Sequence, residues 1–196
     1  MARPKSIEDE EILEAARQVF LEEGIQATTA AIAEHAGISE GTIYRRWPTK
    51  HDLFTAAMDI PYPPGWMETL AAIEDEADLF DALTRLGLEI IEFFEEIIPK
   101  INMVMCNLEE NQIFNASDEP PPVRGMKPII QFFHRQRRAA RLKQRDPEIV
   151  ARMFMGSLHH FAFSEVSGLN EFMPMPRETY VRGVVKNLLE GIQQED

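Results

Sequence analysis

The side chains best suited to contact a nucleic acid are concentrated in residues 28–50, which read TTAAIAEHAGISEGTIYRRWPTK. An arginine such as Arg45 can donate two hydrogen bonds to guanine, a glutamate such as Glu40 can accept one from cytosine, and the hydroxyl of Thr42 can bond to several base edges. Arg46 is a further donor. Lys50 stands where a helix is expected to begin, so its charge and the free backbone N–H groups can meet a phosphate together. This chemistry predicts recognition of double-stranded DNA.

The spacing of small and apolar residues predicts how this segment positions those side chains. Ile32, Ala33 and Ala36 share one face of a first short helix, and the two alanines are small enough for a second helix to cross closely. Gly37 can take the positive φ that ends a helix. Ser39 is expected to cap the next helix, its hydroxyl accepting from a free backbone N–H. Two helices joined by such a turn make a helix-turn-helix.

The second of these helices is expected to turn one face inward and the other toward DNA. Ile43 and Trp47 lie one turn apart and are expected to be buried. The opposite face is polar and suited to the major groove; it carries Glu40, Gly41, Thr42, Tyr44, Arg45 and Arg46. An ordinary solvated helix face is the alternative, and the surrounding helix-turn-helix pattern argues against it.

This stretch resembles the DNA-binding domain of the TetR family of transcriptional regulators. The residues that carry the resemblance are Gly24, Thr28, Thr29, Ile32-Ala33, Ala36-Gly37-Ile38-Ser39, Gly41-Thr42-Ile43-Tyr44, Trp47, Lys50 and Leu53. The chain departs from the usual pattern at Trp47, where phenylalanine is usual, and at Arg46, where histidine is frequent. The run before Ile32 is also shorter than usual, so the resemblance leaves open whether Thr28 or Thr29 caps the second helix and contacts a phosphate.

The resemblance implies a function for the whole chain. It implies that Tyr44 and Lys50 contact phosphates, that two copies form a homodimer through the last two helices, and that the later helices enclose a cavity. A dimer would set two recognition helices about one DNA turn apart, as a palindromic operator requires. A small apolar or amphipathic effector in the cavity would release the operator. We therefore expect a ligand-responsive repressor and not an enzyme.

The composition restricts the class of protein. Hydrophobic residues make up 44% of the chain and charged residues 27%, as in globular proteins. The single cysteine, Cys106, excludes an internal disulfide and a cysteine-based zinc site, which fits a reducing cytoplasm. No apolar run approaches the roughly 20 residues that span a bilayer, and the first residues lack the apolar segment of a signal peptide. We therefore expect a cytoplasmic protein with no membrane partner.

The net charge of −13 is unusual for a DNA-binding protein. Residues 1–50 contain six Lys or Arg and nine Asp or Glu, but five of the six positive residues lie in the first five residues or between Arg45 and Lys50. The acidic charge elsewhere should suppress indiscriminate DNA binding, and the affinity should fall with added salt.

The rest of the chain is predicted to be all-α, with about nine helices in total and no strand alternation. The first helix has a clear apolar face at spacings of three and four, formed by Ile12, Ala15, Ala16, Val19 and Phe20. Three prolines and a glycine in residues 61–66 interrupt the chain, and later helical patterns cover residues 75–98, 101–108, 126–142, 146–169 and 177–192. Pro99 is expected to separate two of these helices. We divide the chain into a DNA-binding domain, residues 1–48, and an effector-binding and dimerisation domain, residues 49–196.

Methionine and aromatic side chains in the later helices have two interpretations. Most must form the core, but adaptable methionines and aromatic rings also suit a ligand cavity. The candidate ligand-binding residues are Phe94, Met103, Met105, Phe132, Phe133, Phe154 and His159.

Three other features lead to negative or alternative expectations. Because neighbouring residues on a helix point about 100° apart, His159 and His160 are expected to be one buried and one exposed rather than a metal site, and no other metal or cofactor is expected. The basic run at residues 135–145 is expected to be a solvated helix end that complements the helix dipole. The rival functions are a helical enzyme that uses the cavity and an adaptor that does not bind DNA.

Overall fold

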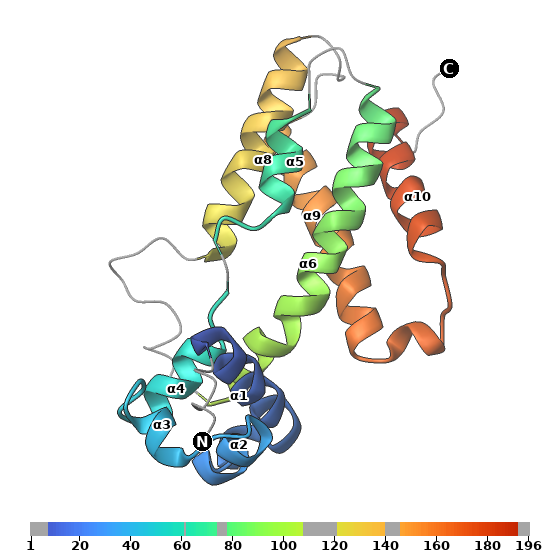
Figure 1. Cartoon of the computed structure of the whole chain (residues 1–196). Coiled ribbons are helices and arrows are strands. Elements are labelled where there is room, and N and C mark those ends of the chain that lie inside the picture. Colours follow the sequence, from blue (N-terminus) through green and yellow to red (C-terminus); the bar gives the residue numbers. More distant parts are fainter. Residues whose placement is uncertain (1–7, 61, 74–77, 108–120, 140–145, 192–196) are drawn as a thin grey trace. The chain divides into compact units, whose positions relative to one another are not determined.

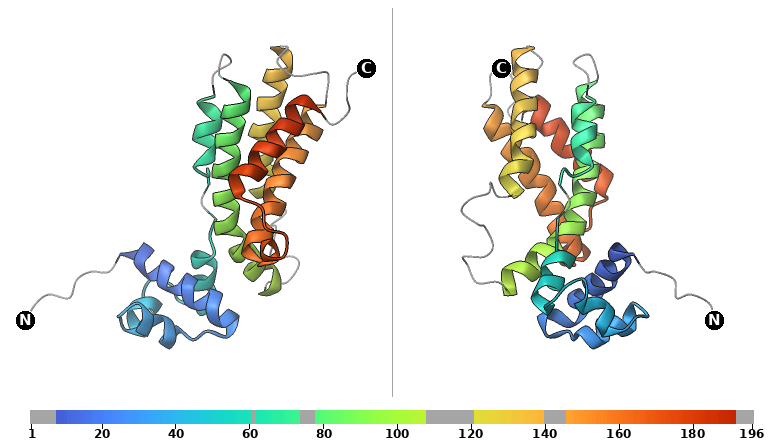
Figure 2. Two further views of the ribbon diagram at one scale, coloured as in Figure 1. Left: turned by 90° about the vertical axis from the view of Figure 1, so that its right-hand side faces the viewer. Right: turned by 60° about the vertical axis from the view of Figure 1, so that its left-hand side comes forward.

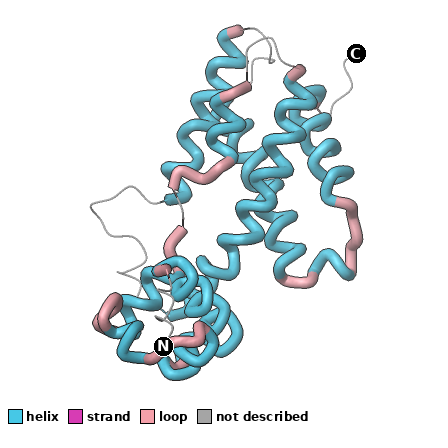
Figure 3. The backbone as a smooth tube through the Cα atoms, in the orientation of Figure 1, coloured by secondary structure: helices cyan, strands magenta, loops and turns pink. Residues whose placement is uncertain are grey.

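The computed structural model describes residues 8–60, 62–73, 78–107, 121–139 and 146–191, and in these residues all regular structure is helical (Figures 1 and 3). The nine α-helices and two 3-10 turns of these residues are α1 (Asp9–Glu23), η1 (Gly24–Gln26), α2 (Thr29–His35), α3 (Glu40–Tyr44), α4 (Lys50–Ala57), α5 (Trp66–Ala71), α6 (Leu79–Asn107), α8 (Pro121–Arg138), α9 (Pro147–Val166), η2 (Leu169–Glu171) and α10 (Arg177–Glu190). The all-α prediction is confirmed. None of the described helices is long and apolar enough to span a bilayer.

The chain divides into two compact units. Met1–Pro61 and Pro99–Ile113 form the first, and Tyr62–Ile98 and Phe114–Asp196 form the second. The first unit extends beyond residue 48 because α4 packs against α1 in the same core. The functional division at residue 48 stays a prediction.

The core of the first unit is the apolar face expected of the first helix. All five predicted positions of α1, from Ile12 to Phe20, are buried. Phe20 meets Phe54 of α4 edge to face, with ring centroids 5.1 Å apart. Arg17 of α1 donates from Nε to the carbonyl oxygen of Ala57, 3.0 Å away, and so caps the C-terminus of α4. These contacts make α1 and α4 the support on which α2 and α3 are mounted.

The second unit is built on α8, α9 and part of α6. Figure 2 shows α8 beside α9 and α10 against α9, in agreement with the contacts between these helices. Gly87 lets α6 approach α9 and α10 closely, because a Cβ atom there would lie 2.8 Å from Cγ1 of Val181 in α10 and 3.5 Å from Cδ2 of Leu158 in α9. Asp146 caps α9 with Pro147 in the first turn, which is the position where a helix best tolerates proline.

The prediction that Pro99 separates two helices is wrong. Pro99 lies inside α6, which is continuous from Leu79 to Asn107. A proline in a helix removes one hydrogen bond and costs about 3 kcal/mol, so packing on both sides must outweigh that cost. Before the proline, Ile97 and Ile98 are buried, and after it Met103 and Val104 pack against the core of the first unit.

Candidate nucleic-acid interface

The turn between α2 and α3 is held by backbone hydrogen bonds and by one left-handed residue. Gly37 has a φ of 68°, a left-handed conformation that favours glycine. The backbone N–H of Ile38 donates to the carbonyl oxygen of Ala33 at a distance of 2.9 Å. At the start of α2, Thr28 is the cap residue, because its hydroxyl accepts from the backbone N–H of Ala31 at 3.1 Å. Of the two candidates, Thr28 rather than Thr29 therefore caps α2. Which of the two contacts a DNA phosphate stays a prediction.

The hydroxyl of Ser39 does not act as predicted. Ser39 is the N-cap residue of α3, but its Oγ bonds to Oγ1 of Thr42, 3.0 Å away, and not to a backbone N–H. The backbone N–H of Thr42, the expected donor, is already bonded to the carbonyl oxygen of Ser39 at 2.9 Å. The tight first turn of α3 thus leaves the serine side chain free to order Thr42.

Arg45 lies along the same side of α3 and touches this pair. Its Nε donates to the carbonyl oxygen of Gly41 and its Nη2 donates to Oγ1 of Thr42, each at a distance of 3.2 Å. A guanidinium has five N–H donors, so three remain available. Ser39, Thr42 and Arg45 therefore form a continuous polar line at spacings of three residues, from which both a hydroxyl and a guanidinium can reach a base edge.

A second network joins α2 to the outer face of α3. Oγ1 of Thr29 lies 3.1 Å from Oε2 of Glu40 and 2.9 Å from the hydroxyl of Tyr44. An ionised carboxylate can only accept, so the single proton of Thr29 goes to Glu40, and Tyr44 must donate its own proton to Thr29. Glu40 and Tyr44 are therefore both oriented by Thr29, whose side chain is buried although its two partners are exposed.

Gly41 is exposed and has no structural need to be a glycine. A Cβ atom at this position would meet only Oγ of Ser39, at 3.9 Å, which is ordinary van der Waals contact. Its φ lies outside the left-handed region, and a glycine weakens a helix by about 1 kcal/mol relative to alanine. The small residue thus leaves open space on the outside of α3.

Arg46 is placed differently from the other polar residues of α3. Its Nη1 lies 2.8 Å from Oδ1 of Asp9 at the start of α1, and its side chain is only 27% exposed. This ion pair ties the end of α3 to the first helix, so Arg46 has a structural role that the sequence pattern did not reveal. Lys50 is half-buried at the start of α4, where Thr49 and Asp52 form a reciprocal capping box as their spacing suggests.

Trp47 and Ile43 support this surface from inside. Ile43 is fully buried, and Trp47 is partly buried against the same core. Three of the acidic residues of α1 are engaged by arginines: Glu10 and Glu14 pair with Arg17, and Asp9 pairs with Arg46. These pairs partly neutralise the acidic residues of α1, which packs beside the helix-turn-helix.

The structure does not gather the candidate ligand-binding residues around one cavity. Phe132, Phe133 and Phe154 are brought together, with centroids 5.3 Å apart for the first pair and 6.2 Å for the second, but all three are fully buried core residues. Met103 packs in the first unit, and Met105 is 57% exposed. A role of these five residues in binding an effector stays a prediction.

Phe94 and His159 form a separate contact in the second unit. Their rings meet edge to face, with centroids 5.2 Å apart. Partial burial lowers the pKa of His159 below its usual value, and the charge of His160 lowers it further. The expectation that one of the two histidines is buried is wrong, because both residues are exposed overall and the Phe94 ring covers only part of His159. In the described residues no three His, Cys, Asp or Glu side chains are grouped as metal ligands.

The comparisons with known proteins agree with this geometry. Residues 12–57 match the family described as bacterial regulatory proteins of the tetR family. An HTH-type transcriptional regulator of Mycobacterium tuberculosis is 29% identical over 134 residues, which cover 68% of this chain and 64% of that protein. The nucleoid occlusion factor SlmA of Edwardsiella ictaluri is 34% identical over 98 residues, 49% of each chain. The chain thus spans between half and two thirds of these two relatives.

A solved structure extends the likeness to the whole fold. A TetR-like transcriptional regulator from Rhodococcus sp. RHA1 is 20% identical, has a TM-score of 0.64, and is matched over 97% of this chain and 100% of that chain. At this identity the likeness establishes the fold alone, and the matched helix-turn-helix supplies the family. Residues 12–57 therefore form a helix-turn-helix domain of the TetR family of transcriptional regulators.

Proposed function

We propose that the protein is a sequence-specific DNA-binding regulator that occupies a palindromic operator as a homodimer and represses transcription. The outer face of α3 inserts into the major groove, Thr42 and Arg45 contact base edges, and Tyr44 and Lys50 contact phosphates. Thr28 and the first turn of α2 lie against the adjacent phosphates. Glu40 acts mainly by orienting Tyr44 through Thr29, because its carboxylate already accepts the hydrogen bond from Thr29.

One observation carries this proposal: the exposed side of α3 holds an ordered line of hydrogen-bond donors beside an unfilled glycine position. Arg45 is fixed by Thr42 and by the carbonyl oxygen of Gly41, so its guanidinium loses little conformational freedom on binding. Gly41 leaves room for a DNA backbone to approach. A purely structural helix would gain stability from a side chain at that position.

A homodimer is supported by the outer face of α9. Ile149 and Met153 are 58% and 56% exposed, and Phe163 continues the same stripe further along the helix. Gly156 lies between them with nothing within 4 Å of its Cβ position, so a second helix can approach closely. The exposed positions of α10 are mostly polar, so α9 supplies most of the apolar contact in the proposed dimer, and the share of α10 is smaller than the sequence suggested.

Release by a small molecule requires a difference in affinity between two states. An apolar or amphipathic effector that binds the DNA-incompetent state about 10⁴-fold more tightly can move the population from 99:1 to 1:99. An effector that binds both states equally changes nothing, however tightly it binds.

The test is electrophoretic mobility shift with genomic fragments and three proteins: the parent, Arg45→Ala and Arg85→Ala. Arg85 is an exposed arginine of α6 and serves as the matched control for loss of one positive charge. We expect Arg45→Ala to weaken binding to the selected fragment roughly 10- to 100-fold, from the 1–3 kcal/mol of a bidentate base contact. Arg85→Ala should match the parent. Equal binding by all three proteins would refute the assignment of α3 as the recognition helix.

A further inference from the structure

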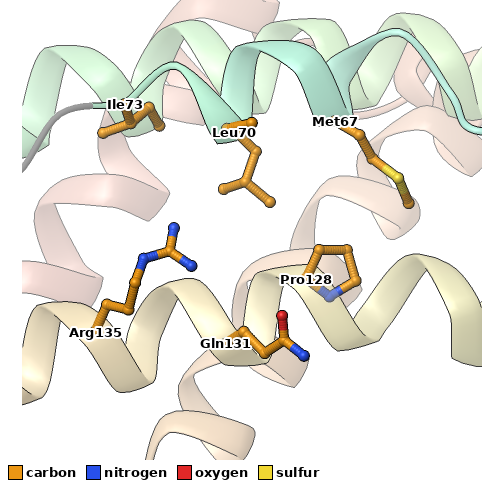
Figure 4. A pocket seen from close by; sticks show the side chains of 7 residues that line it. Met67, Leu70, Ile73, Pro128, Gln131 and Arg135 are labelled. Carbon is orange, nitrogen blue, oxygen red and sulfur yellow. The ribbon is translucent and has the colours of Figure 1, made fainter.

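The second unit contains an open cleft between α5 and α8 that none of the candidate ligand-binding residues line. Its volume is about 550 Å³, within the range of small-molecule sites. The residues that line it are Met67, Leu70, Ala71, Ile73, Pro128, Gln131 and Arg135. In Figure 4, Met67, Leu70 and Ile73 on the α5 side face Pro128, Gln131 and Arg135 on the α8 side.

The cleft has an apolar wall and a polar wall. The α5 side offers Met67, Leu70 and Ile73, and the last two are almost fully buried. From Met67 to the end of α5 at Ala71 the helix rises roughly 6 Å, at about 1.5 Å per residue, and Ile73 extends the wall just beyond the helix. An aliphatic chain of medium length or a pair of fused rings can lie along such a wall.

The α8 side presents its two polar side chains, Gln131 and Arg135, in one row with Pro128. Pro128, Gln131 and Arg135 are spaced by three and four residues and therefore share one face of α8. In Figure 4 the guanidinium of Arg135 points across the cleft toward α5, and Gln131 lies one turn away. The guanidinium carbon of Arg135 is 5.8 Å from the centre of the Phe132 ring, which restricts the position of the side chain.

The charge of Arg135 has no acidic partner among the ion pairs of the described residues. Complementing the dipole at the C-terminus of α8 accounts for a cation near this end, but Arg137 and Arg138 already stand there. Only Arg135 of the three lines the cleft. A planar guanidinium beside an amide and facing an apolar wall matches a carboxylate attached to an apolar body.

We propose that the α5–α8 cleft binds an amphipathic carboxylic acid in its ionised form. Arg135 donates two hydrogen bonds to the carboxylate, the amide of Gln131 donates a third, and the apolar body lies on Met67, Leu70 and Ile73. The proposal names the chemical class of the effector, and the release of DNA by that effector rests on the proposed function. Binding of the carboxylic acid in the cleft does not depend on the proposed function.

The experiment is calorimetric titration of the full chain with octanoate and with octanamide, its uncharged analogue, in the absence of DNA. The variants are Arg135→Gln and the matched control Arg138→Gln, which removes an exposed cation from the same helix end without altering the cleft. We expect the parent and Arg138→Gln to bind octanoate equally, and Arg135→Gln to bind it at least tenfold more weakly. Octanamide should bind the parent more weakly than octanoate does, and Arg135→Gln should leave its affinity unchanged.

Absence of octanoate binding by the parent would overturn the proposal, as would equal octanoate affinity in Arg135→Gln or equal affinity of the parent for octanoate and octanamide. Mobility shifts of the parent protein on its selected fragment, with and without octanoate, then separate the two proposals. Loss of the shift with octanoate supports both. A protein that binds octanoate but no DNA would refute the proposed function and leave the cleft assignment intact.

Discussion

Gly41→Ala is expected to stabilise the protein and to weaken its binding to DNA. The added methyl group has room inside the chain, because its nearest atom would be Oγ of Ser39 at 3.9 Å. Replacing a helical glycine by alanine gains up to about 1 kcal/mol, which corresponds to roughly 2–4 °C in melting temperature for a chain of this size. On the outside, the same methyl group occupies the space that the proposed DNA contact needs.

The loss of DNA affinity follows from overpacking against a rigid partner. An extra methyl group in a filled interface typically costs about 1–3 kcal/mol, or roughly 5- to 150-fold in Kd. The matched control is Gly125→Ala in α8, whose Cβ would also have its nearest neighbour at 3.9 Å, an atom of the Trp66 ring. Gly125→Ala should raise the melting temperature by a similar amount and leave DNA binding unchanged.

The assay pairs thermal unfolding of each variant with fluorescence anisotropy on the selected DNA fragment. A stabilised Gly41→Ala protein that binds DNA as tightly as the parent would refute the close approach of DNA to this side of α3. A destabilised Gly41→Ala protein would refute the packing argument itself.

Two further predictions concern the polar networks. In a double-mutant cycle of Thr29→Val and Tyr44→Phe, chemical unfolding should give a coupling free energy of about 0.5–1.5 kcal/mol, and additive effects would contradict the hydrogen bond between the two hydroxyls. Arg177→Met should destabilise the protein by up to about 1 kcal/mol at pH 7 and by little at pH 4. Burial raises the pKa of Glu95, although the charge of Arg177 opposes this shift. The ionised carboxylate therefore costs stability once the pH rises through that pKa. Removing Arg177 raises the pKa of Glu95 further and so increases the cost at pH 7, whereas at pH 4 the carboxyl is protonated with or without the arginine. A pH-independent effect would contradict that assignment.

Local signals in the sequence were sufficient for the helices and the turn of the helix-turn-helix, although not for the hydrogen bond of the Ser39 side chain. The apolar face of α1, the left-handed Gly37 and the capping box of Thr49 and Asp52 all lie within one or two helical turns of the residues that define them. Interactions at this range depend on residue spacing, which can be read directly. The same holds for Asp146 and Pro147 at the start of α9.

Contacts between distant residues could not be predicted from spacing. The ion pair between Asp9 and Arg46 joins α1 to α3, and Arg17 reaches the last carbonyl of α4, 40 residues away. Spacing also gives the wrong expectation at Pro99, because the packing of Ile98 in one core and of Met103 against the other outweighs a local preference.

The cleft between α5 and α8 illustrates the same limit. Arg135 belongs to a basic run that is visible in the sequence, but its relation to Leu70 depends on the packing of two helices. The aromatic candidates Phe132, Phe133 and Phe154 have the composition of a ligand site and the burial of a core. Composition alone does not separate those two roles.

The central claim is that two copies of α3 read a two-fold DNA site, and footprinting tests it most directly. Genomic fragments are first enriched by the purified full chain, and the enriched fragment is then mapped by hydroxyl-radical cleavage. We predict two protected half-sites related by a palindrome, with centres one helical turn, about 34 Å, or a multiple of it apart. A single unrepeated footprint, or no enrichment of any fragment at low salt, would contradict the account.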